Sequence, residues 1–199
     1  MTASTTARIQ LLRVDMTRMR VEATPLPEEW FLLGGRALTA RILLDECDAT
    51  CDPLGPDNVL IFAGGVLGGT AAPTSGRLSV GSKSPLTQGI KEANAGGNPA
   101  QHLAKLGFRA IVVTGQPLDP EARFGLEVDE YGGRLVPADD LKGLWTYATC
   151  ERLTQRYSKK ASFICCGPAG EHRLAGASVA CTDQDNRYPA RHASRGGMG

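Results

Sequence analysis

The chain has 199 residues, enough for one domain or for two small halves that share a core. Lys and Arg number 22 against 21 Asp and Glu, so the net charge of +1 gives no basic field for nucleic acid. No apolar window reaches the roughly 18 residues of a membrane-spanning helix, and residues 1–7 lack the apolar stretch of a signal peptide. We therefore expect a cytoplasmic protein with a flexible tail over residues 1–7 and neither nucleic acid nor membrane as a partner.

The six cysteines and three histidines show no metal-site spacing. Cys47 and Cys51 have a C-x3-C spacing, but no second pair of ligands follows, which favours two small loop residues over a metal or cluster site. Cys165 and Cys166 are adjacent in an expected strand and so point to opposite faces. Because no secretory signal is present, we expect no disulfides.

The first half of the chain alternates strand and helix patterns between paired glycines, which mark sharp turns or close approaches to the backbone. Two short apolar runs predict a hairpin, and a continuous apolar run ending at Gly64-Gly65 predicts a buried strand. The elements expected here are strands 9–14, 19–23, 59–63, 77–82 and 110–114, helices 37–46 and 101–106, and a tight loop at 94–97.

The second half repeats this order of elements. Its patterns predict a hairpin, a helix capped by Thr146, a buried strand that ends at Gly167-Pro168, and a loop that leads to a last glycine pair. The expected ranges are strands 124–128, 133–136 and 162–166, a helix 146–157, one or two strands within 174–181, and a loop at 194–197.

Both halves therefore close on a Gly-Gly loop, one beginning at Asn94 and the other at Ser194. We predict an α+β fold in which internally duplicated β-α-β units form two mainly antiparallel sheets with flanking helices. The pseudo-repeats would cover about 8–108 and 109–199. Because only the order of elements repeats and not the sequence, chance similarity is the alternative.

The two Gly-Gly loops are the candidate binding elements, since glycine lets the backbone come close to a ligand. Arg77, Lys83 and Ser84 stand beside the first loop, and Arg195 lies in the second. Arginine suits bidentate contact with phosphate, so the parts suit a ligand with two anionic arms. The alternative is that the glycines only form turns and the arginines are solvated. Phosphate-loop, dinucleotide-binding and serine-nucleophile motifs are missing from the sequence, which disfavours a nucleotide-binding domain.

Several motifs together resemble the N-terminal domain of the aldehyde ferredoxin oxidoreductase family, the tungsten pterin enzymes. They run in order over nearly the whole chain, and they are highly specific only as a set. The matching stretches are Leu12-Arg13-Val14-Asp15, Gly34-Gly35-Arg36-Ala37-Leu38, Asp52-Pro53-Leu54-Gly55-Pro56-Asp57-Asn58-Val59-Leu60, Ser75-Gly76-Arg77-Leu78-Ser79-Val80, Lys83-Ser84-Pro85-Leu86-Thr87, Asn94-Ala95-Gly96-Gly97 and Arg195-Gly196-Gly197-Met198-Gly199.

The resemblance implies a tungsten (or molybdenum) bis-pyranopterin cofactor whose metal is ligated by the dithiolenes of the cofactor. It implies that the backbone carbonyls of Asn94 and Gly196 face a magnesium ion that joins the two pterin phosphates. The residues that it places against the pterins are Arg77, Gly96, Arg195 and Gly197. In the full enzymes an aldehyde is oxidised to a carboxylate, and electrons leave through a [4Fe–4S] cluster.

The cluster ligands and the residues near the metal belong to two further helical domains, which we expect to be missing from this chain. A fragment, a truncated product or one piece of a split enzyme would then need those domains or a complementing subunit, and a ferredoxin-like electron carrier. A homodimer is also compatible. The chain departs from the family at Val66, where a proline is usual, and at Asn98-Pro99, where aromatic residues are usual. These departures leave open a non-catalytic remnant or assembly subunit without cofactor.

Overall fold

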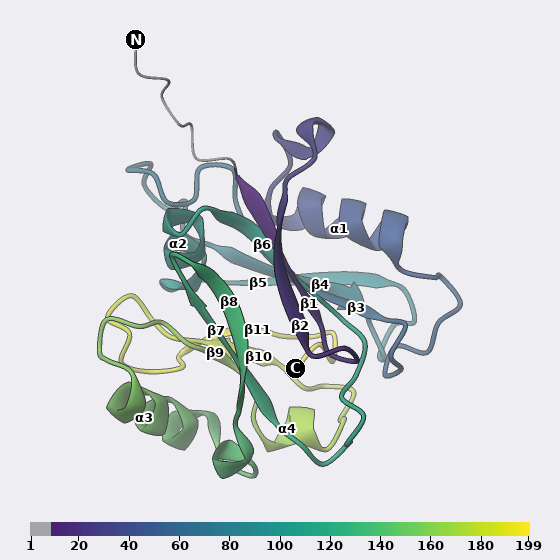
Figure 1. Ribbon diagram of the computed structural model, residues 1–199, viewed down its shortest axis with the longest axis vertical. Coiled ribbons are helices and arrows are strands. Elements are labelled where there is room, and N and C mark those ends of the chain that lie inside the picture. The colour runs from purple at the N-terminus through teal and green to yellow at the C-terminus, as the bar shows by residue number, and fades with distance from the viewer. Residues whose placement is uncertain (1–8) are drawn as a thin grey trace.

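The computed structural model describes residues 9–199, and a six-stranded sheet with the order β2-β1-β6-β3-β4-β5 dominates its first half (Figure 1). All neighbouring strands are antiparallel except β1 and β6, which run parallel. The strands are β1 (Gln10–Asp15), β2 (Arg20–Pro25), β3 (Val59–Gly64), β4 (Leu78–Lys83), β5 (Ile90–Ala95) and β6 (Phe108–Thr114).

One face of this sheet is covered by helix α1 (Gly35–Glu46). Leu38, Ile42 and Leu43 of the helix are buried against alternate apolar residues of the strands, such as Ile61 and Val112. The helix comes very close to β4, because a Cβ added at Gly81 would lie 2.5 Å from Cβ of Thr39. That glycine therefore fixes the spacing between α1 and the end of the sheet that carries β5.

The opposite face of the sheet is covered by the rest of the chain. Helix α2 (Pro99–Lys105) buries Leu103 against β1 and β6, while the hairpin of β7 (Phe124–Asp129) and β8 (Gly132–Pro137) packs beside it. A three-stranded sheet packs under β4 and β5. Its strands are β9 (Ile164–Cys165), β10 (Val179–Cys181) and β11 (Arg191–Ala193).

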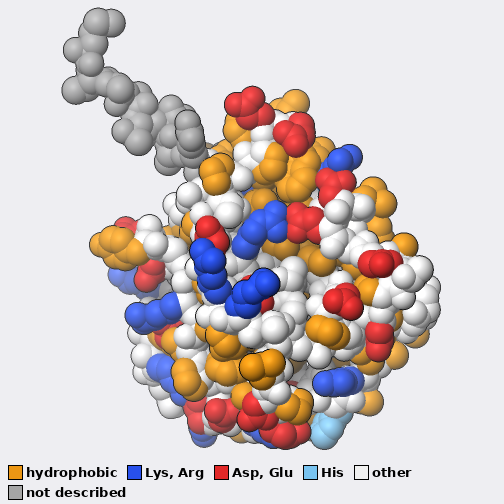
Figure 2. All heavy atoms as spheres, turned by 45° about the vertical axis from the view of Figure 1, so that its right-hand side comes forward, with side chains coloured by type: hydrophobic (Ala, Val, Ile, Leu, Met, Phe, Trp, Pro, Cys, Tyr) orange, Lys and Arg blue, Asp and Glu red, His pale blue; other side chains and the backbone are white. Residues whose placement is uncertain are grey.

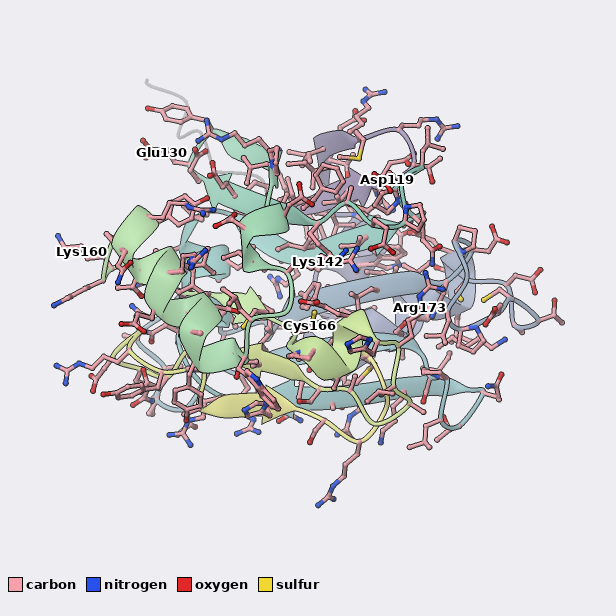
Figure 3. The ribbon with its side chains drawn as sticks, turned by 90° about the horizontal axis from the view of Figure 1, so that it is seen from below. Asp119, Glu130, Lys142, Lys160, Cys166 and Arg173 are labelled. Carbon is pink, nitrogen blue, oxygen red and sulfur yellow. The ribbon has the colours of Figure 1, made fainter. Side chains whose placement is uncertain are left out.

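Two further helices complete the second half, α3 (Thr146–Arg156) and α4 (Pro168–Glu171). Figure 1 shows them on the far side of the molecule from α1, and Figure 3 shows the same layers from below. Over residues 9–199, no helix is long and apolar enough to cross a membrane.

The α+β class is confirmed, with some differences in detail. The described residues form three sheets and not two, because the hairpin β7–β8 pairs with neither of the others. Strands β5 and β11 and helix α4 were not expected, and the strand expected at 162–166 is reduced to Ile164–Cys165. The cap expected at Thr146 is wrong: Trp145 precedes the first turn and provides no side-chain cap. The tail expected at 1–7 lies outside the described residues.

The order of elements does recur along the chain. Each half contains a hairpin, a 3-10 turn, a helix, three strands and a Gly-Gly turn in this order, with α4 as an additional helix in the second half. The 3-10 turn is Glu28–Trp30 in the first half and Asp139–Leu141 in the second. Strand β6 contains the expected boundary at 108/109 and pairs with β1 and β3 of the first half. The internal duplication stays a prediction.

Candidate functional site

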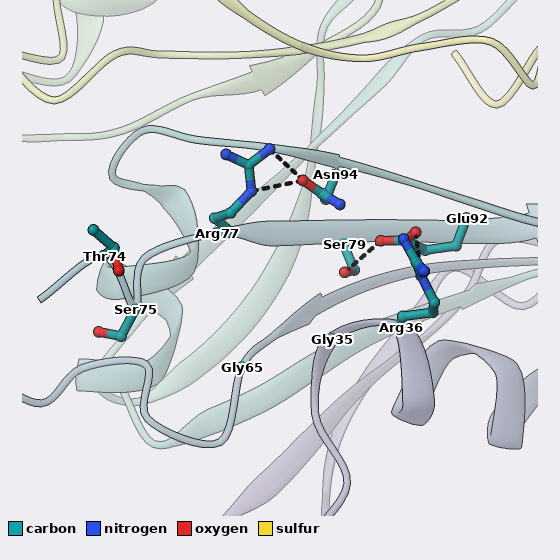
Figure 4. Close-up of a pocket in the computed structure, with 9 residues that line it drawn as sticks. All are labelled: Gly35, Arg36, Gly65, Thr74, Ser75, Arg77, Ser79, Glu92 and Asn94. Carbon is teal, nitrogen blue, oxygen red and sulfur yellow. Dashed lines mark hydrogen bonds and ion pairs between the residues drawn. The ribbon is translucent and has the colours of Figure 1, made fainter. Parts of the chain in front are cut away.

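The hairpin of β4 and β5 brings together two of the predicted site residues. Its register pairs Ser79 with Asn94, which places Arg77, just before β4, beside the end of β5. The Arg77 Nε donates a hydrogen bond of 2.6 Å to Asn94 Oδ1, and Nη2 donates to the same oxygen (Figure 4). The Asn94 side chain thus orients an exposed guanidinium, whose remaining donors stay free for a ligand.

A cavity of about 340 Å³ opens at this pair, on the face of the sheet that carries α1. Its walls combine two arginines, three hydroxyl groups, one carboxylate, one amide and two glycines (Figure 4). These residues are Gly35, Arg36, Gly65, Thr74, Ser75, Arg77, Ser79, Glu92 and Asn94. The first residues of α1 belong to the wall, so the positive end of the helix dipole also faces the cavity.

Glu92 is the least exposed charged group of the cavity, with 8% of its side chain accessible. It accepts a hydrogen bond of 2.7 Å from Ser79 Oγ and one of 3.0 Å from Arg36 Nε. Arg36 is 76% exposed, so this ion pair holds an otherwise mobile guanidinium at the mouth of the cavity. With two guanidinium groups and one carboxylate, the cavity favours an anionic ligand.

The second Gly-Gly loop lies on the opposite face of the same sheet. A Cβ added at Gly196 would lie 2.7 Å from Cγ of Lys91, a residue of β5. Because side chains alternate along β5, Lys91 points away from the face that carries Asn94. The structure thus brings the second loop, at Gly196, against β5, the edge strand that carries Asn94 near its end.

Ser84 fixes the second loop. Its hydroxyl is fully buried and donates a hydrogen bond of 2.7 Å to the carbonyl of Gly196. Gly197 has φ +67°, and a Cβ there would lie 2.5 Å from the carbonyl oxygen of Ala175, so only glycine fits. Arg195 also has positive φ, at 69°, and its side chain is exposed. Such a conformation in arginine is uncommon and gives its side chain a fixed starting direction.

Gly96 differs from the other loop glycines. A Cβ added there would meet only Cδ of Arg191, 4.0 Å away, and its φ lies outside the range reserved for glycine. Nothing in the described chain requires a glycine at this position. The lack of a side chain leaves open space beside β5.

One predicted candidate is corrected. Lys83 was a candidate beside the first loop, but it is 7% exposed, and its Nζ donates to the backbone carbonyls of Ala49 and Cys51. It therefore stabilises a loop. Sequence reasoning also missed Arg36, Ser79 and Glu92. Arg36 and Ser79 lie within motifs that carried the family resemblance, but only the register of β4 and β5 shows that they share the cavity with Arg77.

Comparison with known proteins shows which family the chain resembles. The family model named "Aldehyde ferredoxin oxidoreductase, N-terminal domain" matches residues 11–199 of the sequence. The tungsten-containing aldehyde ferredoxin oxidoreductase of Pyrococcus furiosus is 36% identical over 200 residues, 96% of this chain and 30% of that protein. Its counterpart in Pyrococcus abyssi is 35% identical over 193 residues, again 96% of this chain and 30% of that protein.

Among solved structures, the active-site complex BamBC of benzoyl coenzyme A reductase with 1,5-dienoyl-CoA has a TM-score of 0.86 to this chain. The identity is 29%, over 96% of this chain and 28% of that one. The chain thus spans about 30% of the length of these curated relatives. A match across residues 11–199 and identities of 35–36% lead to one conclusion: the chain belongs to the aldehyde ferredoxin oxidoreductase family, of which it carries the N-terminal domain.

Proposed function

We propose that this chain is the cofactor-binding base of a tungsten (or molybdenum) bis-pyranopterin oxidoreductase. The complete enzyme would oxidise aldehydes or related carbonyls to carboxylates and pass electrons to ferredoxin or a similar carrier. The observation that carries this proposal is the hydrogen-bonded pair of Arg77 and Asn94 at an open cavity with a second arginine.

The charges of the cavity suit a phosphate-bearing group. Arg36 and Arg77 present guanidinium donors, which bind phosphate oxygens in pairs, and Thr74 and Ser75 add hydroxyl groups. The open space beside Gly96 suits a bulky ligand that crosses the edge of β5 toward Arg195. On this proposal Arg77, Gly96, Arg195 and Gly197 contact the two pterins.

A magnesium ion is part of the same proposal. Asn94 and Gly196 would each direct a backbone carbonyl to it, between the two pterin phosphates. A carbonyl oxygen has two lone pairs, and Ser84 uses one of those on Gly196. The other is available to a hard cation, which prefers oxygen ligands.

The bound metal dithiolene group would supply the redox chemistry, and this chain would supply positioning and charge. The guanidinium groups would neutralise phosphates, and the bond from Ser84 would hold the second loop in place before the cofactor arrives. A [4Fe–4S] cluster and a lid over the metal would come from further domains or a complementing subunit. The greater length of the relatives supports that division.

The experiment is to express the chain together with the remaining family domains and to compare the wild type with Arg77→Ala/Arg195→Ala. Tungsten, molybdenum and pterin are then measured per mole of purified protein. We expect the double variant to lose most of the metal and the pterin. Arg20→Ala/Arg187→Ala, which removes two exposed arginines outside both loops, serves as the matched control and should keep them.

Equal cofactor content in the double variant and the wild type would contradict the proposal that Arg77 and Arg195 bind the cofactor. Consistent absence of both metals from the wild-type assembly would favour the alternative, a non-catalytic subunit that keeps the fold without cofactor. Circular dichroism of each variant separates cofactor loss from unfolding.

A further inference from the structure

Cys47 and Cys51 form a thiol pair just after the last residue of α1, at the opposite end of this helix from Arg36 of the cavity. Their Sγ atoms lie 3.7 Å apart, and both residues are half-buried, so a small reagent can reach them. Cys47 is held by its backbone, since its N–H donates to the carbonyl of Leu43 in the last turn of α1. Cys51 is held by a turn, with its N–H bonded to the carbonyl of Asp48.

The loop that carries this pair is held in place by the side chains of Lys83 and Asn58. The Lys83 ammonium group donates to the carbonyls of Ala49 and Cys51, at 2.6 Å for the first. Asn58 joins the far end of the loop to β4, through a hydrogen bond of 2.9 Å from Nδ2 to the carbonyl of Lys83. These contacts keep the backbone on both sides of the thiols in one conformation, so the thiols stay close together.

We propose that Cys47 and Cys51 are a redox modification site, at which exchange with a low-molecular-weight disulfide forms an intramolecular disulfide. One thiolate attacks the external disulfide, forms a mixed disulfide and releases one small thiolate. The second thiolate then attacks the protein sulfur of that mixed disulfide. The Cys47–Cys51 bond forms, the second small thiolate leaves, and both electrons end on the released thiols.

The geometry favours ring closure over a lasting mixed disulfide. Sulfur atoms in a disulfide are about 2.05 Å apart, so the two Sγ atoms, now 3.7 Å apart, need only a short approach to form the bond. Among the other cysteines of residues 9–199, Cys150 and Cys181 are buried, and the hydrogen-bonded thiol partner of the half-buried Cys165 is the buried Cys150. Cys166 is exposed beside α4 (Figure 3), but has no hydrogen bond to another cysteine in the described part of the chain.

The test treats the full chain with glutathione disulfide and then alkylates the free thiols with iodoacetamide. The buffer should be mildly alkaline, because burial and the hydrogen bond to Cys51 raise the pKa of the Cys47 thiol. Trypsin places both cysteines in the peptide 42–77, since Arg41 and Arg77 bound it. We expect most of this peptide to be two hydrogen masses lighter than the reduced form and to resist alkylation until a reductant is added.

The matched variant Cys51→Ser lacks the second thiol and should stop at a glutathione adduct on Cys47. In Cys166→Ser the internal bond should form as in the wild type. The proposal is overturned if the wild-type peptide keeps stable glutathione adducts, or if both cysteines remain fully open to alkylation after treatment.

Discussion

The two Gly-Gly loops are built in different ways. The first follows a hairpin with six paired positions between β4 and β5, and the second follows β11, which has three paired positions with β10. The second loop relies on contacts from the first half, namely the hydrogen bond from Ser84 and the packing of Lys91. A loop with few backbone partners of its own can thus be fixed by side chains from a more regular neighbour.

Gly97 lies very close to the backbone of the second half. Its φ is +101°, and a Cβ there would lie 2.0 Å from the carbonyl oxygen of Thr182. We expect Gly97→Ala to lower the free energy of unfolding by more than about 4 kcal/mol, since backbone strain and overlap with a backbone atom add. Urea unfolding of the purified chain measures this loss.

Gly107 offers a matched control. It also has a positive φ, at +90°, but an added Cβ would meet nothing within 4 Å. Gly107→Ala should therefore lose only the conformational cost, about 1–2 kcal/mol. If the two variants lost equal stability, the halves would not be in tight contact at Thr182.

Ser84→Ala tests whether the first half holds the second loop. The change leaves the carbonyl of Gly196 without its hydroxyl partner in a buried place and should cost about 1–3 kcal/mol. Urea unfolding measures the cost, and proteolysis should cut the chain faster near Arg195. Ser158→Ala removes a hydroxyl from an exposed turn and should stay within about 0.5 kcal/mol of the wild type. A Ser84→Ala variant as stable as this control would contradict the interpretation.

A smaller effect is expected inside the second half, where Glu127 of β7 accepts hydrogen bonds from Tyr157 and Arg134. These contacts lower the pKa of the Glu127 carboxyl from its ordinary value of 4.5, with the Tyr157 hydroxyl as the main cause. Because the carboxyl pKa is lower in the folded than in the unfolded chain, the group stabilises the fold at pH values above its ordinary pKa. This stabilisation is lost as the pH falls through the pKa that Glu127 has in the folded protein.

Glu127→Gln should therefore reduce the stability at neutral pH by less than about 1 kcal/mol, because solvent screens the partly exposed group. It should also flatten the fall in stability below pH 4.5, the ordinary value for this carboxyl. Thermal unfolding at a series of pH values measures both effects. Glu130→Gln, in the exposed turn of the same hairpin, is the control and should keep the acid dependence of the wild type.

Much of the first half could be predicted from the sequence, most clearly β3 and the end of β6, because these strands bury continuous apolar runs. Strand β5 was missed for a physical reason. The segment Ile90–Ala95 lies at the edge of the sheet, and its exposed and half-buried positions carry Lys, Glu and Asn. Strand β11 is short and mostly exposed, so it leaves no apolar pattern either.

Missing β5 also limited the prediction of the site. Arg77 and Asn94 were identified from motifs, but their hydrogen bond depends on the register between β4 and β5, which needs both strands. Glu92 could not be distinguished from a solvated charge before its neighbours Ser79 and Arg36 were known. The role of Ser84 depends on a contact with Gly196 across 112 positions, a separation that local pattern does not encode.

The parallel pairing of β1 with β6 has a consequence for folding during synthesis. Leu12 pairs with Ile111 and Val14 with Val113. About half of the chain must therefore be synthesised after β1 before its partner β6 exists. Until Phe108–Thr114 leave the ribosome, one edge of β1 in the hairpin β1–β2 is unpaired, and the apolar side chains that β1 buries in the folded protein are exposed. Non-local pairing of this kind slows folding. The nascent first half is therefore the stage at which this protein should depend most on a chaperone.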